Sequence, residues 1–230
     1  MGASRSEMAQ NDRGFIMPWG ISHKHKFIFI HIPKTAGTTI CSNWQGSPLK
    51  EICTEYGVLG GTHKTALQLK EMFPAEWDKY LKFAVVRNPY GRFISKYFFK
   101  QLKARPIEDF ENYVWDDRET EALLPQLYWL TDRHDYFLPV SQYDRADLHF
   151  GNIIVDRVLR YENLNKELGD LFSELGISPC DVLPHFRRTQ KIDNPDDYFP
   201  THFKALVTYL YREDLKRFDY QYPYGGDDER

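Results

Sequence analysis

The stretch FIFIHIPKTAGTTI, residues 27–40, joins an alternating apolar run to a loop of small and hydroxylated residues. The run Phe27–His31 alternates and is rich in β-formers, which predicts a strand. Apolar residues then recur at helical spacing until Gly46-Ser47-Pro48 stops the helix: Ala36, Ile40 and Trp44. A helix N-terminus at the end of a strand presents amides and the positive end of the helix dipole. The stretch therefore predicts a loop that binds an anion such as a phosphate.

The loop itself carries groups suited to that anion. Lys34 adds a point charge, Gly37 permits close approach of the backbone, and two threonine hydroxyls add donors. The residues expected to contact the anion are Lys34, Thr35, Ala36, Gly37, Thr38 and Thr39. The alternative is an ordinary turn between a strand and a helix, with a surface lysine.

Two further segments repeat the order of strand followed by helix. Residues 82–87 (KFAVVR) form a short apolar run, and Ile94, Tyr97, Phe98 and Leu102 follow at helical spacing. Residues 152–159 (NIIVDRVL) form the third candidate strand. The stripe after it ends at Gly176 and contains Leu164, Leu168, Leu171, Phe172 and Leu175. Three such units predict a parallel sheet with crossover helices. Ligands bind beyond the carboxyl ends of parallel strands, where Lys34 and Arg87 are expected to meet.

The remaining chain gives weaker patterns. Residues 107–114 suggest one helix, the sequence after it suggests loops able to form a lid, and a last helix is expected over 202–216. We expect three parts: a flexible N-terminal segment, 1–22, a single domain, 23–222, and a flexible tail, 223–230.

Composition excludes several classes of protein. The 230 residues are 42% hydrophobic, enough for one sizeable core, and the net charge of −3 argues against a nucleic-acid binder. The three cysteines lack CxxC spacing, so neither a zinc site nor a disulfide framework is indicated. No apolar run is long enough for a transmembrane segment.

The loop is not a Walker A motif, because Lys34 precedes Gly37 instead of following the second glycine. No apolar strand ends in a clear magnesium-binding aspartate; Asp156 is the nearest candidate and falls inside a predicted strand. Both observations weaken the alternative of an ATP-dependent phosphotransferase.

Two motifs together resemble a known family. HIPKTAGTT, followed by VVRNPYGRFISKY at 85–97, is similar to the motif pair of sulfotransferases that use 3′-phosphoadenosine-5′-phosphosulfate (PAPS). The resemblance is strongest to carbohydrate sulfotransferases of the heparan and uronyl 2-O type, including small soluble bacterial members. It implies that the first loop holds the 5′-phosphosulfate and that Arg87 and Ser95 hold the 3′-phosphate. With the strand and helix pattern, we expect an α/β, P-loop-NTPase-like three-layer fold whose central, mainly parallel sheet is flanked by helices. Taken singly, Arg87 and Ser95 are equally compatible with structural roles.

A histidine is the candidate base. Thr65 and Gln68 predict a capping box, so a helix should begin at Ala66 with His63 just outside it. The positive helix end there disfavours imidazolium and keeps the ring able to accept a proton. The resemblance places a catalytic histidine between the two nucleotide motifs, where His63 lies. Lys34 would then stabilise the leaving phosphate, and no metal is required.

Other residues leave alternatives open. There are eight histidines, and a lone loop histidine is often solvated or structural. His31 is expected in packing, His185 is a weaker rival for the base, and Arg92 either lies near the site or pairs with an acidic neighbour. Residues 185–189 (HFRRT) resemble the family's late loop, in which Arg187 and Arg188 would hold an acidic sugar and Thr189 the 3′-phosphate. The alternative is a solvated basic loop. Lys96 is expected on the wet face of the second helix.

The sequence thus favours an enzyme that transfers a sulfuryl group from PAPS to a hydroxyl, with a carbohydrate as the favoured acceptor. The alternatives are a nucleotide phosphotransferase and a non-catalytic module that binds a nucleotide or a glycan. The expected compartment is the cytoplasm, or the Golgi lumen if the chain is a trimmed catalytic domain.

Overall fold

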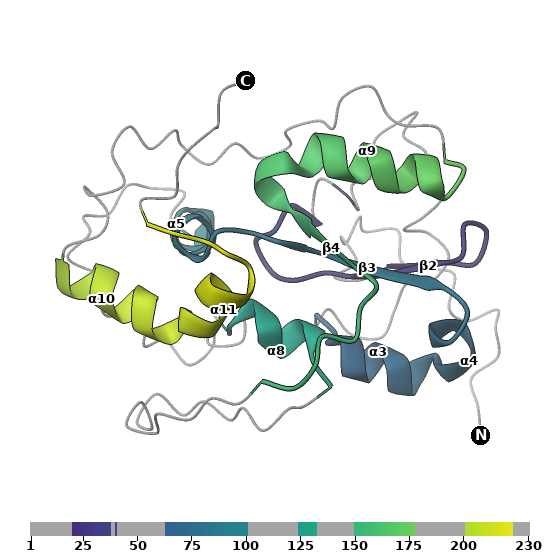
Figure 1. Ribbon diagram of the computed structural model, residues 1–230, viewed down its shortest axis with the longest axis horizontal. Coiled ribbons are helices and arrows are strands. Elements are labelled where there is room, and N and C mark those ends of the chain that lie inside the picture. The colour runs from purple at the N-terminus through teal and green to yellow at the C-terminus, as the bar shows by residue number, and fades with distance from the viewer. Residues whose placement is uncertain are drawn as a thin grey trace.

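A four-stranded sheet forms the centre of the computed structural model (Figure 1). The structure describes residues 20–37, 40, 63–100, 124–132, 150–177 and 201–222. The strands lie in the order β1 (Gly20–Ser22), β2 (Phe27–Ile30), β3 (Leu81–Val86) and β4 (Arg157–Arg160). β1 is antiparallel to β2, whereas β2, β3 and β4 are mutually parallel. The expected mainly parallel α/β sheet is confirmed.

The strand boundaries differ from expectation at two places. β1 lies in residues 20–22, at the end of the segment expected to be flexible, where main-chain pairing with β2 compensates for a weak sequence pattern. The third strand was expected over 152–159 but β4 begins only at Arg157. Ile153 instead forms an isolated bridge with Thr131. An apolar run therefore identified the strand but not its start.

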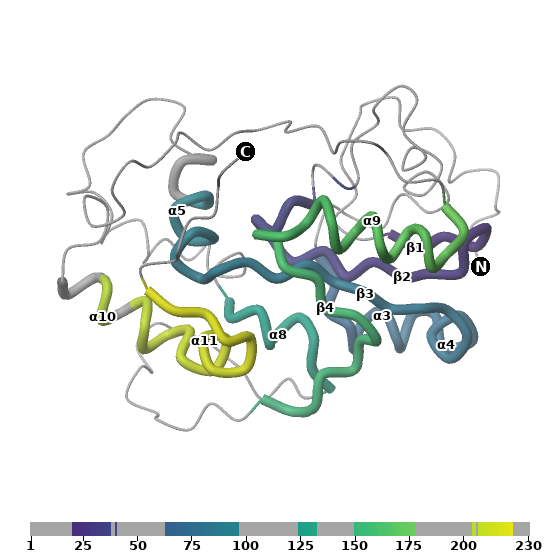
Figure 2. The backbone as a smooth tube through the Cα atoms, turned by 45° about the horizontal axis from the view of Figure 1, so that its top comes forward, coloured from purple at the N-terminus to yellow at the C-terminus, as the bar shows by residue number. Residues whose placement is uncertain are grey.

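Helices cover both faces of the sheet, as Figures 1 and 2 show. Their bounds are α3 (Ala66–Met72), α4 (Pro74–Trp77), α5 (Pro89–Lys100), α8 (Gln126–Leu130), α9 (Leu164–Glu174), α10 (Thr201–Leu210) and α11 (Arg212–Arg217), with a 3-10 turn, η4 (Tyr161–Asn163), before α9. In both views α9 lies on one side of the sheet, whereas α3, α4 and α8 lie on the other, with α11 beside α8.

Alternation along β2 explains why both faces are covered. Phe27 and Phe29 are buried with α9 in one apolar cluster, whereas Ile28 and Ile30 are buried in a second cluster with α3, α4, α8 and α11. Successive side chains of a strand point to opposite faces, so a strand apolar at every position requires two covering layers. This two-sided core makes the sheet edge, where the strands end, the place where polar loops gather.

Helix expectations are largely confirmed within the described residues. α5 and α9 occupy the expected segments, and Gly176, with φ of +68°, follows α9 as the expected stop. The last helix was expected to be continuous, but α10 and α11 are separated at Tyr211, whose buried side chain and φ of −108° interrupt it. α8 was not expected, and the helix expected over 107–114 lies outside the described residues. Among the described helices, none is both long and apolar enough to cross a membrane.

Candidate functional site

The two loops that carry the recognised motifs meet at the carboxyl edge of the sheet. β2 and β3 pair in parallel with Ile30 opposite Ala84, so the residues after both strands come together. Nη1 of Arg87 lies 3.5 Å from the carbonyl oxygen of Lys34, which is a long contact. The expectation that Lys34 and Arg87 share one edge is confirmed.

The backbone of the first loop adopts an unusual conformation. Lys34 and Ala36 have φ of 68° and 70°, in the left-handed region that side chains other than glycine disfavour. Each such residue costs on the order of 1–3 kcal/mol and persists only where surrounding contacts hold it. Turns that include left-handed residues can bring successive backbone amides together, as in the nests that bind anions.

Four consecutive carbonyl oxygens of this loop each lie against a side-chain donor. His63 Nδ1 lies 2.8 Å from the oxygen of His31, and Thr35 Oγ1 lies 2.9 Å from that of Ile32. Arg92 Nε donates to the oxygen of Pro33 at 2.9 Å, and the Arg87 contact to Lys34 is the fourth. These donors come from three separate parts of the chain, so tertiary contacts hold the carbonyl side of the loop.

This arrangement fixes where the amides point. In a trans peptide the N–H is directed opposite to the C=O of the same unit. Because the oxygens of Pro33 and Lys34 are held by inward donors, the N–H groups of Lys34 and Thr35 point the other way. The Thr35 hydroxyl is itself buried and donates to the Ile32 carbonyl, so the backbone N–H, and not the hydroxyl, is the Thr35 group that points away from these donors.

Gly37 also has a packing role that the sequence did not indicate. A Cβ built on Gly37 would lie 1.6 Å from Nε2 of His31. The His31 ring is buried and packs against the rings of Phe29 and His63, with centroids 5.7 and 4.6 Å away. The missing side chain therefore makes room for a histidine behind the loop. The expected packing role of His31 is confirmed.

Arg87 is held both by its main chain and by its side chain. Its amide donates to Oε1 of Gln126 at 2.7 Å, and Nε2 of Gln126 donates back to the Arg87 carbonyl at 2.9 Å. The guanidinium lies 4.0 Å from the centroid of the Tyr161 ring, a cation–π arrangement that sets its direction. The next amide, of Asn88, donates to Glu162 at 2.8 Å.

Helix α5 contributes three buried polar side chains behind the two loops. Ser95 is buried on the helix two turns from its start, as its expected position requires. Arg92 donates to the carbonyl oxygens of Pro33 and Leu124, so it holds the first loop, and the acidic Asp214 also acts on it electrostatically. Lys96 is only 8% exposed, so its expected place on the wet face of the helix is wrong.

His63 lies where the capping box predicts. Thr65 caps α3 and exchanges both hydrogen bonds with Gln68, which confirms the box. Because the carbonyl oxygen of His31 only accepts, Nδ1 of His63 carries the hydrogen in the 2.8 Å contact. The neutral ring then has its lone pair on Nε2. Within the described residues, nothing bonds that nitrogen.

The pKa of His63 is lowered from its ordinary value of 6.5. Burial of the ring is the largest cause, and the nearby charges of Arg92 and Lys96 lower the pKa further, against the bond to His31. The direction agrees with expectation, but burial and two cations, not a helix dipole, are the causes. The ring is therefore uncharged at neutral pH and able to take a proton.

Asp156, the nearest candidate for a magnesium ligand in the sequence, does not lie beside the first loop. Asp156 precedes β4 at the amino end of the strand, where it bridges Lys82 at 2.9 Å and accepts from the Lys82 amide. It lies at the opposite end of the sheet from Lys34. In the part of the chain that the structure describes, no group of three or more His, Cys, Asp or Glu side chains is placed to hold a metal ion.

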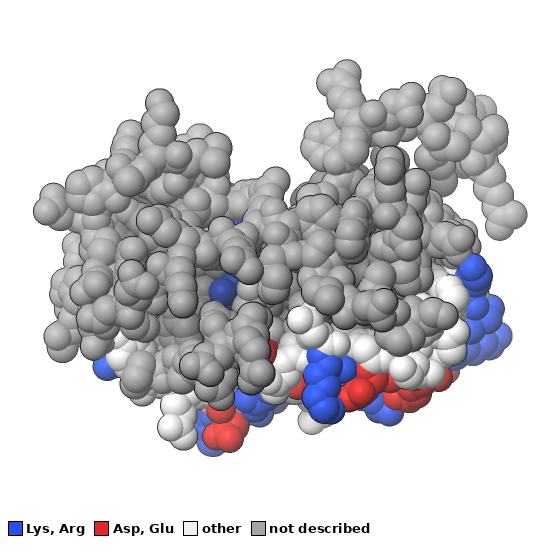
Figure 3. Space-filling view, turned by 90° about the horizontal axis from the view of Figure 1, so that it is seen from above, with Lys and Arg blue, Asp and Glu red and all other residues white. Residues whose placement is uncertain are grey.

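The surface view adds a further observation. Figure 3 shows lysine, arginine and acidic side chains interleaved along one margin of the described surface.

Several expected site residues lie outside the described residues: Thr38, Thr39, His185, Arg187, Arg188 and Thr189.

The sequence patterns missed three residues that support the site: Gln126, Glu162 and Asp214. Gln126 and Glu162 hold the amides of Arg87 and Asn88, and Asp214 holds Gln126. These pairs are separated by 39, 74 and 88 residues along the chain, so no local spacing signals them.

Comparison with known proteins gives one match. The chain matched none of the curated proteins and none of the solved structures with which it was compared. The segment 19–124 matches the model of a sulfotransferase family, and it contains both loops together with His63 and Ser95. Over that segment the chain is therefore similar to sulfotransferases, a family of transferases whose donor is PAPS.

Proposed function

We propose that this protein is a sulfotransferase that moves a sulfuryl group from PAPS to a hydroxyl, on a P-loop-NTPase-like three-layer fold. The observation that carries the proposal is the first loop, whose four carbonyl oxygens are turned toward side-chain donors while the amides of Lys34 and Thr35 point away. Such a loop is suited to an oxyanion. The family match over both motifs supports PAPS as the source of that anion.

The donor nucleotide would bridge the two loops. The 5′-phosphosulfate would lie on the first loop, held by Lys34 and the backbone of residues 35–39. The 3′-phosphate would lie at the second, where Arg87 offers a planar fork and Ser95 a hydroxyl. The long Arg87 contact to the Lys34 carbonyl leaves the guanidinium able to exchange that contact for two short bonds to a phosphate.

The chemistry would proceed by in-line displacement at sulfur. Nε2 of His63 takes the proton of the acceptor hydroxyl as its oxygen attacks, so the new O–S bond forms as the proton leaves. The bond between sulfur and the bridging phosphate oxygen breaks, and its electron pair remains on that phosphate. Lys34 stabilises the resulting charge. The bond from Nδ1 to the His31 carbonyl fixes the ring's tautomer and orientation throughout.

A carbohydrate hydroxyl is the acceptor that we favour, as in the 2-O-type enzymes that the motifs resemble. Arg187 and Arg188 would contact an acidic sugar and Thr189 the 3′-phosphate. The acceptor must reach Nε2 of His63, which is on a half-buried ring beside Trp129, with centroids 5.7 Å apart.

The phosphotransferase alternative finds less support. It needs an aspartate near the loop to hold magnesium, but Asp156 lies at the amino end of β4, paired with Lys82. The alternative of a non-catalytic module leaves unexplained why the pKa of a histidine at the site is lowered by burial and two cations.

The experiment is calorimetric titration with the desulfated product, 3′-phosphoadenosine-5′-phosphate, and in parallel with ATP and magnesium. We expect tight binding of the bisphosphate, weakened by Lys34→Ala and by Arg87→Ala, with ATP weak. The matched controls are Lys70→Ala on the exposed face of α3 and Arg157→Ala at the amino end of β4, which should bind like the wild type. Preferential binding of ATP, or no binding by folded protein, would refute the proposal.

A second measurement separates catalysis from binding. His63→Ala should keep its affinity for the bisphosphate and lose transfer of radiolabelled sulfate from PAPS to a panel of hydroxylated sugars. If wild type binds the nucleotide but transfers sulfate to no acceptor, and His63→Ala is indistinguishable from it, the protein is the binding module instead.

A further inference from the structure

The side chain of Gln126 forms hydrogen bonds with both main-chain polar groups of Arg87. Gln126 accepts from the Arg87 amide at 2.7 Å and donates to its carbonyl at 2.9 Å. Two bonds of opposite sense to one residue fix both its donor and its acceptor, much as a neighbouring strand would. Gln126 is fully buried, so water does not compete for these bonds. They set the point from which the Arg87 side chain leaves the sheet.

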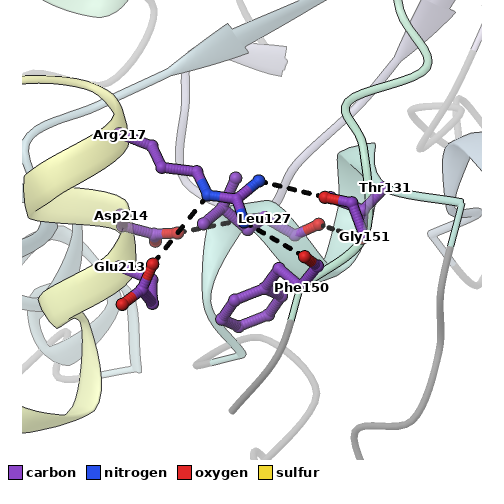
Figure 4. A network of polar contacts seen from close by, with 7 residues as sticks. All are labelled: Leu127, Thr131, Phe150, Gly151, Glu213, Asp214 and Arg217. Atoms are coloured by element: carbon purple, nitrogen blue, oxygen red, sulfur yellow. Dashed lines mark hydrogen bonds and ion pairs between the residues drawn. The ribbon is translucent and has the colours of Figure 1, made fainter.

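Gln126 is in turn held by a buried carboxylate. Asp214 of α11 is fully buried and accepts from the amides of Gln126 and Leu127 at 2.6 and 3.0 Å, and from Nε2 of Gln126 at 3.4 Å. Figure 4 shows Asp214 directed at the main chain of Leu127, with Arg217 reaching the carbonyls of Phe150 and Gly151. The carboxylate therefore fixes the main chain and the side chain of Gln126 together.

The α8 helix does not require so costly a cap for its own sake. Its N-cap residue is Pro125, which makes no side-chain cap bond, and a local serine or aspartate at that position would satisfy the same amides. Instead a carboxylate is buried on a separate helix. Arg92, itself buried, is the positive charge that acts on Asp214, and Tyr211 also faces Arg92. A buried charge that serves only a five-residue helix is a poor way to gain stability.

We propose that Gln126 and Asp214 are positioning residues for Arg87, and that their hydrogen-bonded chain determines the affinity of the nucleotide's 3′-phosphate site. The inference rests on the proposed function, because Arg87 is assigned to that phosphate there. Neither residue touches the nucleotide. Both act through the Arg87 main chain, while the ring of Tyr161 holds the guanidinium from the other side at 4.0 Å. A displaced Arg87 presents its fork at the wrong angle, and bidentate binding tolerates little error.

The test is a double-mutant cycle read by titration with 3′-phosphoadenosine-5′-phosphate. The variants are Gln126→Met, which keeps the shape of the side chain and removes its polar atoms, Arg87→Ala, and the two combined. We expect Gln126→Met alone to weaken binding by about tenfold and to have no further effect once Arg87 is alanine. A merely structural role would weaken both backgrounds equally.

The matched control is Thr131→Val, in the segment that ends α8. It removes a buried hydrogen bond of 2.9 Å to the Leu127 carbonyl, at the opposite end of α8 from Gln126. Its affinity should stay within about twofold of the wild type. Asp214→Asn is the second variant, used in the same cycle if Gln126→Met does not unfold cooperatively, because an amide meets the two main-chain donors with only one acceptor oxygen.

Each outcome is informative. No binding by folded wild type refutes the proposed function, and with it this inference. Binding that Arg87→Ala weakens, but that Gln126→Met and Asp214→Asn leave unchanged, refutes the inference alone. The inference is also refuted if Gln126→Met lowers the affinity equally in the Arg87→Ala background. It is refuted as well if Thr131→Val lowers the affinity as much as Gln126→Met does.

Discussion

Gly37→Ala offers a test of the packing behind the first loop, residues 31–37. The new Cβ would lie 1.6, 2.0 and 2.1 Å from three ring atoms of His31. Ordinary contact between such atoms is about 3.5 Å, so the ring and the loop must separate by about 2 Å. The ring has no room to turn away, because Phe29 and His63 flank it and it is 7% exposed.

The expected magnitude follows from two opposing effects. Overpacking costs about 1–3 kcal/mol, and a rigid, buried group such as this one should lie near 3 kcal/mol. Alanine is otherwise better than glycine at a helical position by roughly 0.5–1 kcal/mol. In a His31→Ala background the ring is gone, so Gly37→Ala should stabilise the protein by up to about 1 kcal/mol. The effect of Gly37→Ala on the free energy of unfolding therefore changes sign between the two backgrounds. The coupling energy between the two positions should reach about 4 kcal/mol.

The assay is urea denaturation of the wild type, both single variants and the double variant. His31→Ala keeps the main-chain carbonyl that holds His63, so that contact is not removed with the ring. If Gly37→Ala destabilises the two backgrounds to the same degree, the His31 ring is not what excludes a side chain at Gly37. The close packing of the loop on His31 would then be wrong.

Three further predictions concern charge. The rate of sulfate transfer should fall at acid pH with a midpoint below pH 6.5, because the pKa of His63 is lowered. Lys96→Met should move this midpoint to higher pH, because it removes one of the two cations that lower that pKa. An unmoved midpoint would mean that another group titrates. Burial raises the pKa of Asp214 from 3.8 to about 6, so between these values the folded state binds more protons than the unfolded chain. Relative to Asp214→Asn, wild-type stability should therefore fall by about 2.5 kcal/mol from about pH 4 to about pH 7, and parallel curves would contradict this. Asp156→Ala should lower the free energy of unfolding by about 1 kcal/mol, because it removes the bonds of Asp156 to Lys82. The affinity for the bisphosphate should stay unchanged, and weaker binding would place Asp156 in the site.

Much of the fold could be predicted because its signals are local. β2, β3, α5 and α9 each combine a periodic apolar pattern with a stop such as Gly176, and the capping box before α3 lies within four residues. β1 and α8 could not be predicted in this way. β1 is a three-residue edge strand, and α8 has a proline N-cap and is held by Asp214 from another helix. Their stability comes from partners far along the chain.

The candidate site divides in the same way. Lys34, His63 and Arg87 could be found because a strand end, a helix cap and a motif each mark their positions locally. Their functional geometry depends on contacts that no spacing encodes, namely Gln126 on Arg87, Arg92 on Pro33 and His63 on His31. The contact of Gly37 with His31 was missed for the same reason. Its neighbour is a ring six residues earlier, brought back by the turn of the loop.

Two buried charged residues, Arg92 and Asp214, connect the parts of the candidate site. Arg92 holds the Pro33 carbonyl and also adds to the lowering of the His63 pKa that burial causes, so one guanidinium acts on both the first loop and the candidate base. Its own burial lowers its pKa, which Tyr211 and Asp214 oppose. Asp214 in turn holds Gln126 and thereby the Arg87 main chain. The two loops are thus connected through two buried residues of opposite charge, Arg92 and Asp214, and because each charge lowers the cost of burying the other, the loss of either should disturb both loops.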